Sequence, residues 1–174
     1  MTMSSGHSYQ SEISCPPDSR TIRRIAYEIA TISNAESLPC SKSSSIFVRS
    51  DDSKIVLLKA VITGPTDTPY TGGIFEFDIL FPVKPPGYPS APPKVMFRTT
   101  GAGSVRFNPN LYNDGKVCLS LLGTWDGAPG EQWSPDNSTI IQVLISIQSL
   151  ILVPEPYYNE PGYDKSYGTS SGKD

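Results

Sequence analysis

The sequence predicts an α+β fold with one helix, a four-stranded antiparallel meander, a long ordered loop and a second, buried helix. Three observations predict it. Apolar residues recur with helical spacing after residue 18, four short β-branched or aromatic segments follow, and residues 140–152 are apolar almost all round. The length of 174 residues suits a single domain with one sizeable core.

The first helix is expected to follow a tail. Residues 1–17 show no hydrophobic period and end in two prolines, so we expect them to be disordered. Asp18 or Ser19 can cap a helix that should end near Asn34. Its apolar face is expected to hold Ile22, Ile25, Ala26 and Ile29. The opposite face should carry Arg20, Arg23, Arg24 and Glu28.

Four segments are expected to form the meander: residues 46–48, 55–62, 74–81 and 94–98. In the third segment Phe75, Phe77, Ile79 and Phe81 fall on one face of the strand. Residues 81–93 contain six prolines, which excludes regular structure and predicts a rigid, polyproline-like loop.

Residues 99–135 form a long irregular stretch, and such a stretch inside a compact domain is usually functional or disordered. Its apolar anchors, among them Trp125 and Trp133, favour order. The last helix is expected over residues 140–152, since residues 134–136 give a good N-terminal signal and Pro154 ends it. Residues 165–174 are expected to be a second disordered tail.

Composition excludes several classes of function. With 14 Lys and Arg against 17 Asp and Glu, the net charge of −3 leaves no basic surplus for nucleic acid. A single histidine and three cysteines without a CxxC motif disfavour metal sites, cofactor sites and disulfides, and predict a reduced, cytoplasmic or nuclear setting. No segment has the pattern of a signal peptide, and residues 140–153 are too short for a bilayer, which takes about 20 residues.

The long loop contains one cysteine, Cys118, eight residues after Asn110. A lone cysteine between Val and Leu is most often a small buried hydrophobe. Here an Asn-Asp-Gly turn over residues 113–115 can fold Asn110 back toward Cys118. A thiol without a histidine partner can still exchange thioesters, because the leaving group is itself a thiolate. An asparagine N–H can stabilise the oxyanion, so these residues favour acyl carriage over proteolysis.

Several motifs fall in a characteristic order: residues 69–75 and 88–93, Phe107-Asn-Pro-Asn110, Gly115-Lys-Val-Cys118-Leu119, Trp133-Ser-Pro135 and residues 143–150. Together they resemble the catalytic domain of ubiquitin-conjugating (E2) enzymes over residues 20–163. The resemblance implies the E2 fold over residues 18–164, without the two further C-terminal helices that are usual in the family. Within the family, four segments are most similar to E2 domains of the giant inhibitor-of-apoptosis type: residues 104–120, 150–153, 155–157 and 159–163.

The resemblance implies that the chain accepts ubiquitin from an E1 enzyme as a thioester on Cys118 and passes it to a substrate lysine. Asn110 corresponds to the asparagine of the family's His-Pro-Asn motif, which stabilises the oxyanion or orients the loop. Asn108 stands in place of that motif's histidine, and Tyr112 matches an aromatic residue that some members place beside the incoming lysine. The family's acidic residue after the crossing helix has no clean match, and the nearest candidates are Glu160 and Asn159.

The implied partners are ubiquitin, an E1, an E3 ligase or other domains of a parent chain, and a protein substrate. The face with Arg20, Arg23 and Arg24 is either a solvated face or an E1 contact. Ser90 stands where a ligase-anchoring phenylalanine is usual, and residues 124–130 look like an insertion. For Trp133 and Pro135, loop packing is favoured over a partner contact.

Two alternatives remain open. The chain is an inactive E2-like scaffold that only binds ubiquitin or a ligase, or it is a plain interaction module with a similar core. The presence of both Cys118 and Asn110 favours the active enzyme.

Overall fold

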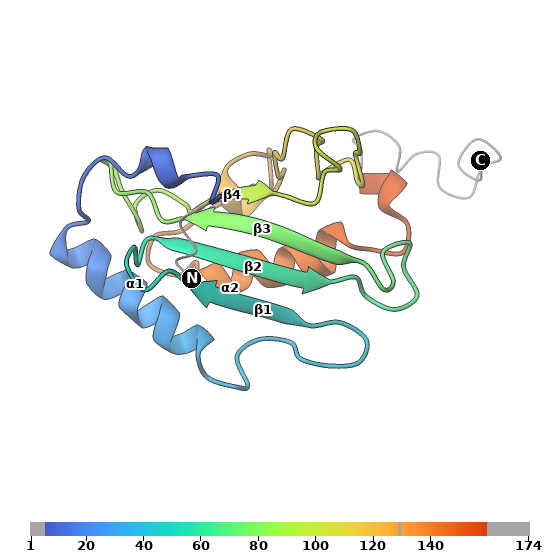
Figure 1. Cartoon of the computed structure of the whole chain (residues 1–174), viewed down its shortest axis with the longest axis horizontal. Helices are drawn as coiled ribbons and strands as arrows, with labels where there is room; N and C mark the ends of the chain where they lie inside the picture. The colour runs from blue at the N-terminus through green and yellow to red at the C-terminus, as the bar shows by residue number, and fades with distance from the viewer. Residues whose placement is uncertain (1–5, 129, 160–174) are drawn as a thin grey trace.

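The computed structural model describes residues 6–128 and 130–159. One antiparallel sheet, in the order β1-β2-β3-β4, forms its centre. Figure 1 shows helix α2 crossing behind the sheet, with helix α1 beside one end of it. The main elements are α1 (Ser19–Ile32), β1 (Ile46–Ser50), β2 (Leu57–Thr63), β3 (Ile74–Leu80), β4 (Lys94–Phe97) and α2 (Ile140–Ser146). Short helical segments are η1 (Gln10–Glu12), η2 (Ser120–Leu122), the π-helical η3 (Ile147–Ile151) that continues α2, and η4 (Pro156–Asn159). The expected α+β class and order of elements are confirmed.

Helix α1 begins where the sequence predicts, but it buries a different face. The Asp18 carboxylate accepts the Thr21 backbone N–H at 2.7 Å, and this bond holds the pKa of Asp18 below its usual value. The buried residues are Thr21, Ile25 and Glu28, whereas Ile22 is 41% exposed. The expected faces are therefore wrong for Ile22 and Ala26, which are exposed, and for Glu28, which is buried. The reason is that the polar groups of Thr21 and Glu28 find hydrogen-bond partners inside the protein.

The buried carboxylate of Glu28 joins three parts of the fold. It accepts hydrogen bonds from Arg24 Nε at 2.9 Å, from the Tyr88 hydroxyl, and from the Ile140 N–H at 3.3 Å. Tyr88 belongs to the proline-rich loop and Ile140 is the first residue of α2. Burial, together with the neighbouring Glu28 charge, raises the pKa of Tyr88, so its hydroxyl stays protonated and donates. This contact fixes the start of α2 against α1.

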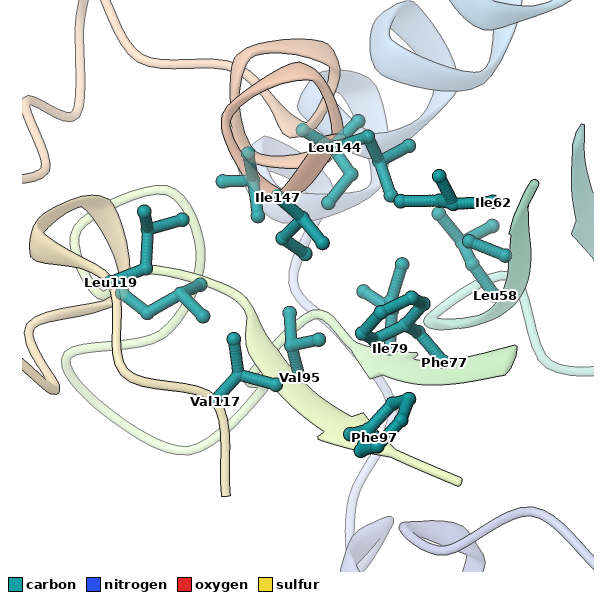
Figure 2. Close-up of a cluster of buried hydrophobic side chains, with 14 of the residues drawn as sticks. Leu58, Ile62, Phe77, Ile79, Val95, Phe97, Val117, Leu119, Leu144 and Ile147 are labelled. Atoms are coloured by element: carbon teal, nitrogen blue, oxygen red, sulfur yellow. The ribbon is translucent and has the colours of Figure 1, made fainter. Parts of the chain in front are cut away.

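The inner face of the sheet carries the core. The register pairs Leu58 with Ile79, Ala60 with Phe77 and Ile62 with Phe75, all of them buried. Figure 2 shows Leu144 of α2 and Ile147 of η3 facing this cluster. The alternation predicted for residues 74–81 is thus confirmed, and the crossing helix is buried against the sheet.

The outer face of the sheet is covered in part by the N-terminal segment, which corrects the expected disordered tail for residues 6–13. His7 is buried and its Nε2 lies 3.0 Å from the Leu58 carbonyl oxygen. The Ser8 N–H donates to Asp78 Oδ2 at 2.7 Å, and Tyr9 packs into the core. The physical reason is Asp78, a buried carboxylate on β3 that requires polar partners. Residues 1–5 and 160–174 lie outside the described residues, as does the expected domain end at 164.

Asp78 is the centre of an ionic cluster. Its carboxylate lies 2.8 Å from Lys59 Nζ and 3.5 Å from Arg98 Nε. Burial raises the pKa of Asp78, but the hydrogen bonds from Lys59 and Ser8 and the nearby His7 outweigh it and leave the pKa below its usual value. The ionised form therefore stabilises the fold.

Within the described residues, no helix has both the length and the apolar character needed to cross a membrane.

Asp78→Asn should lower the free energy of unfolding near pH 7 by about 1–3 kcal/mol, because Lys59 and Arg98 lose their shared carboxylate. Asp78 stabilises the fold fully above its unfolded pKa of about 4, and this contribution is lost as pH falls through the lower folded pKa. Denaturant titrations near pH 7 and near pH 3 measure both effects. The exposed Asp52→Asn serves as the control, and a difference for Asp78→Asn that does not shrink at low pH would contradict this account.

Candidate active site

Asn108 anchors the irregular stretch that carries the candidate cysteine. Its Nδ2 donates to the Tyr70 hydroxyl at 2.8 Å and to the Ile151 carbonyl at 2.7 Å. Its Oδ1 accepts the Asn110 N–H at 2.7 Å. Burial raises the pKa of Tyr70, so its hydroxyl keeps a proton that it donates to the Phe107 carbonyl at 3.2 Å. One buried asparagine thus ties this loop to the β2–β3 connection and to the end of η3.

A tight turn then returns the chain, as the sequence predicts. Leu111 pairs with Val117, and the Tyr112 N–H donates to the Lys116 carbonyl at 3.0 Å. Gly115 makes the turn at a φ of 94°. A Cβ at this position would lie 2.3 Å from Met96 Sδ, so a side chain has no room there.

Asn110 and Cys118 are brought together by two reciprocal hydrogen bonds. The Cys118 N–H donates to the Asn110 carbonyl at 2.9 Å, and Asn110 Nδ2 donates to the Cys118 carbonyl at 3.1 Å. The proximity predicted for these two residues is therefore present in the structure. Asn110 Oδ1 is buried and has no hydrogen-bond partner among the described residues.

Extended backbone around Cys118 separates the thiol from the core. Val117 and Leu119 are both buried, and Figure 2 shows them pointing into the hydrophobic cluster. Because successive side chains of an extended chain alternate in direction, Cys118 points to the other side. There it lines a pocket of about 200 Å³ although it is only 2% exposed. The lining residues within the described part of the chain are all uncharged: Asn110, Cys118, Leu119, Ser120, Trp125, Leu150, Ile151 and Asn159.

Thr124 closes the segment after the cysteine. Its Oγ1 donates to the Val117 carbonyl at 2.6 Å and accepts the Leu119 N–H at 3.0 Å. The chain between them makes η2 and turns at Gly123, which has a φ of 64°. The next residue, Trp125, lines the cysteine pocket. Sequence reasoning assigned Trp125 only to packing, although its place in an expected insertion was a signal.

The three supporting candidates Asn159, Glu160 and Tyr112 differ in where they lie. Asn159 lines the pocket and donates from Nδ2 to the Leu150 carbonyl at 2.9 Å, whereas Glu160 lies outside the described residues. Tyr112 is not among the residues that line the pocket. Its ring centroid lies 4.3 Å from the guanidinium carbon of Arg106 and 5.6 Å from Lys116 Nζ.

The arginine face of α1 divides into two parts. Arg20 and Arg23 are exposed. Arg24 instead donates to the carbonyls of Pro135 and Ser138, at 2.9 and 2.6 Å, besides its bond to Glu28. Arg24 therefore holds the fold together, and so does Pro135 through its carbonyl.

Near the other partner positions, Trp133 Nε1 donates to the Pro89 carbonyl at 2.7 Å and its ring lies 5.6 Å from that of Tyr88. Its packing role is thus present. Ser90, which follows Pro89 in the chain, is exposed. Cys15 and Cys40 are exposed free thiols. Residues 6–128 and 130–159 contain no cluster of three His, Cys, Asp or Glu that could hold a metal ion.

Comparison with known proteins gives one family. The family model described as ubiquitin-conjugating enzyme matches residues 24–171. The chain is 61% identical over 150 residues to the human "Dual E2 ubiquitin-conjugating enzyme/E3 ubiquitin-protein ligase BIRC6", covering 86% of this chain and 3% of that protein. It is 57% identical over 150 residues to the Caenorhabditis elegans "Probable ubiquitin-conjugating enzyme protein 17", covering 86% of this chain and 20% of that protein. The chain therefore spans only a small part of the length of these curated relatives.

A solved structure of human ubiquitin-conjugating enzyme E2 G1 superposes with a TM-score of 0.59 at 28% identity. The match covers 78% of this chain and 97% of that one. The resemblance to ubiquitin-conjugating enzymes and the predicted α+β fold are thereby confirmed. The expected lack of two further C-terminal helices concerns residues outside the described part of the chain.

Asn108→Ala should lower the free energy of unfolding by about 2–4 kcal/mol, because it leaves a buried hydroxyl, carbonyl and N–H without their partner. Differential scanning calorimetry measures the change. Asn113→Ala is the matched control, since Asn113 is exposed and donates only to the Gly103 carbonyl. Equal stability losses in the two variants would show that Asn108 is not the anchor of this loop.

Proposed function

Because the chain belongs to the ubiquitin-conjugating enzyme family, we propose that it accepts ubiquitin from an E1 as a thioester on Cys118 and transfers it to a lysine of a protein substrate. The observation that carries this proposal is the placement of Cys118. It lines a pocket whose described residues are uncharged, and two hydrogen bonds join its backbone to Asn110.

Charging is a thioester exchange. The Cys118 thiol loses its proton to solvent, and the thiolate attacks the carbonyl carbon of the E1 thioester. The new C–S bond to Cys118 forms as the old C–S bond breaks, and the E1 thiolate leaves with the electron pair. The reaction needs no histidine base, because the leaving group is itself a thiolate.

Transfer to lysine requires stabilisation of a tetrahedral oxyanion. In this structure one N–H of the Asn110 side-chain amide donates to the Cys118 carbonyl, and this hydrogen bond orients the loop. The amide carries two protons, and Asn110 also lines the pocket. A rotation of this side chain can therefore bring an N–H to the oxyanion, a role typically worth about 10²–10³ in rate.

The alternatives have less support. An inactive scaffold has no need of a cysteine held in a pocket beside an amide donor, and a plain interaction module has no need of the hydrogen bonds from Asn110 and Thr124 that shape its backbone. Three cysteines without a CxxC motif favour a reduced compartment, so we propose that the activity belongs to the cytoplasm or nucleus.

The proposed partners are ubiquitin, an E1, an E3 ligase or other domains of a longer parent chain, and a protein substrate. Exposed Arg20 and Arg23 support an E1 contact on α1, but Arg24 does not, since its guanidinium is used inside the fold. Ser90 offers almost no apolar surface to a groove that is shaped for phenylalanine. A tethered ligase domain, supplied at high effective concentration, fits this surface better than a freely diffusing one.

Replacing the nucleophile tests the proposal. Cys118→Ser should form a ubiquitin adduct that resists thiol reductants, since an alkoxide is a poorer leaving group than a thiolate. The assay combines the variant with E1, ATP and ubiquitin and compares reducing with non-reducing gels. Cys15→Ser and Cys40→Ser are matched controls that should keep the wild-type, thiol-sensitive adduct. A thiol-sensitive adduct in Cys118→Ser would move the acceptor site to another cysteine.

Asn110→Ala separates the two steps. Charging by E1 should stay within a few-fold of wild type, whereas discharge of the purified thioester to free lysine should slow by about 10²-fold or more. Single-turnover rates for each step measure the split. If both steps lose the same factor, Asn110 acts only by holding the loop.

A further inference from the structure

We propose that Trp125 is the residue that receives the substrate lysine, and this inference rests on the function proposed above. Trp125 is the one aromatic side chain among the described residues that line the Cys118 pocket. It belongs to the expected insertion over residues 124–130, and neither the family match nor the motifs around Cys118 assign it a role.

The position of Trp125 is set by its neighbour. Thr124 bridges Val117 and Leu119, the two residues on either side of Cys118, through one hydroxyl. The direction of the chain at residue 125 is thus coupled to the backbone that presents the thiol. The indole is partly buried, so part of its surface contacts the chain and part remains open to a ligand.

The pocket has the chemistry that a lysine side chain requires. Trp125 and Leu150, which is 59% exposed, offer apolar surface for the four-carbon stem. The indole face attracts an ammonium group through its quadrupole, and tryptophan does this best among the aromatic residues. Among residues 6–128 and 130–159, the side chains that line the pocket carry no charge, so none of them repels the ammonium or pairs with it as a carboxylate would.

Other aromatic residues near the site are less suited to this role. The Tyr112 ring already interacts with Arg106 and Lys116. These two cations disfavour the approach of a third one to the same ring. Trp133 packs against Tyr88 and donates to Pro89, and it does not line this pocket.

The reaction follows from this placement. The ammonium held at the indole loses its proton to solvent, and the free amine attacks the thioester carbonyl carbon. A C–N bond forms, the C–S bond breaks and the electron pair returns to Cys118 Sγ. The second amine proton is lost to solvent as the amide forms. Trp125 takes no part in the bond changes and acts by binding the acceptor.

The test follows discharge of the purified thioester at increasing concentrations of free lysine, after E1 has been inactivated. Trp125→Ala should charge within about twofold of wild type but require about 3- to 30-fold more lysine for half-maximal discharge. Trp125→Phe should lie between the two, because it keeps a smaller aromatic face. Phe47→Ala is the matched control, since Phe47 is an exposed aromatic residue on the sheet strand β1 and should behave as wild type.

Hydroxylamine separates binding from structural damage. This nucleophile has no alkyl stem and no permanent charge near pH 7, so Trp125→Ala should discharge to hydroxylamine at the wild-type rate. Equal slowing with hydroxylamine and lysine would show that Trp125 only supports the loop and would overturn the inference. Wild-type lysine dependence in Trp125→Ala would overturn it too. Failure of the wild-type protein to charge would instead refute the proposed function.

Discussion

The active site depends on the three hydrogen bonds of Asn108. The backbone that carries Cys118 belongs to no regular helix or long ladder, so its polar groups must find other partners. Asn108 supplies them at once: it binds a hydroxyl from the β2–β3 connection, a carbonyl from the end of η3 and the N–H of Asn110. Each buried group left unsatisfied would cost about 1–3 kcal/mol. The amide of Asn108 alone thus satisfies three polar groups of the site.

The rest of the fold positions the partners of Asn108. Buried residues of the sheet face α2 and η3, as Figure 2 shows. Ile151 belongs to the same core, so this packing positions its backbone carbonyl. Glu28 fixes the start of the same helix by accepting the Ile140 N–H. The core thus positions the crossing helix, and the end of that helix positions Asn108. Asn108 in turn holds Asn110, which holds Cys118. Loss of core packing should therefore reach the site through the crossing helix.

Sequence patterns with short range predicted much of this arrangement. The spacing of apolar residues predicted the helices and strands. The eight-residue spacing between Asn110 and Cys118, with a turn between them, predicted their contact. Features that depend on distant partners were missed. His7 and Ser8 are ordered by Leu58 and Asp78, which lie 51 and 70 residues away in the sequence. A buried polar residue such as Glu28 is also predicted to be exposed, because the sequence does not reveal its hydrogen-bond partners. Trp125 escaped assignment because its position depends on how Thr124 folds an irregular loop.

The most direct measurement is to locate the acyl group on the chain. Wild-type protein is incubated with E1, ATP and ubiquitin, and the adduct is digested without reductant and mapped by mass spectrometry. The account predicts a single thiol-labile acyl linkage on Cys118. A linkage on Cys15 or Cys40, or no adduct with any pair of E1 and modifier, would contradict it.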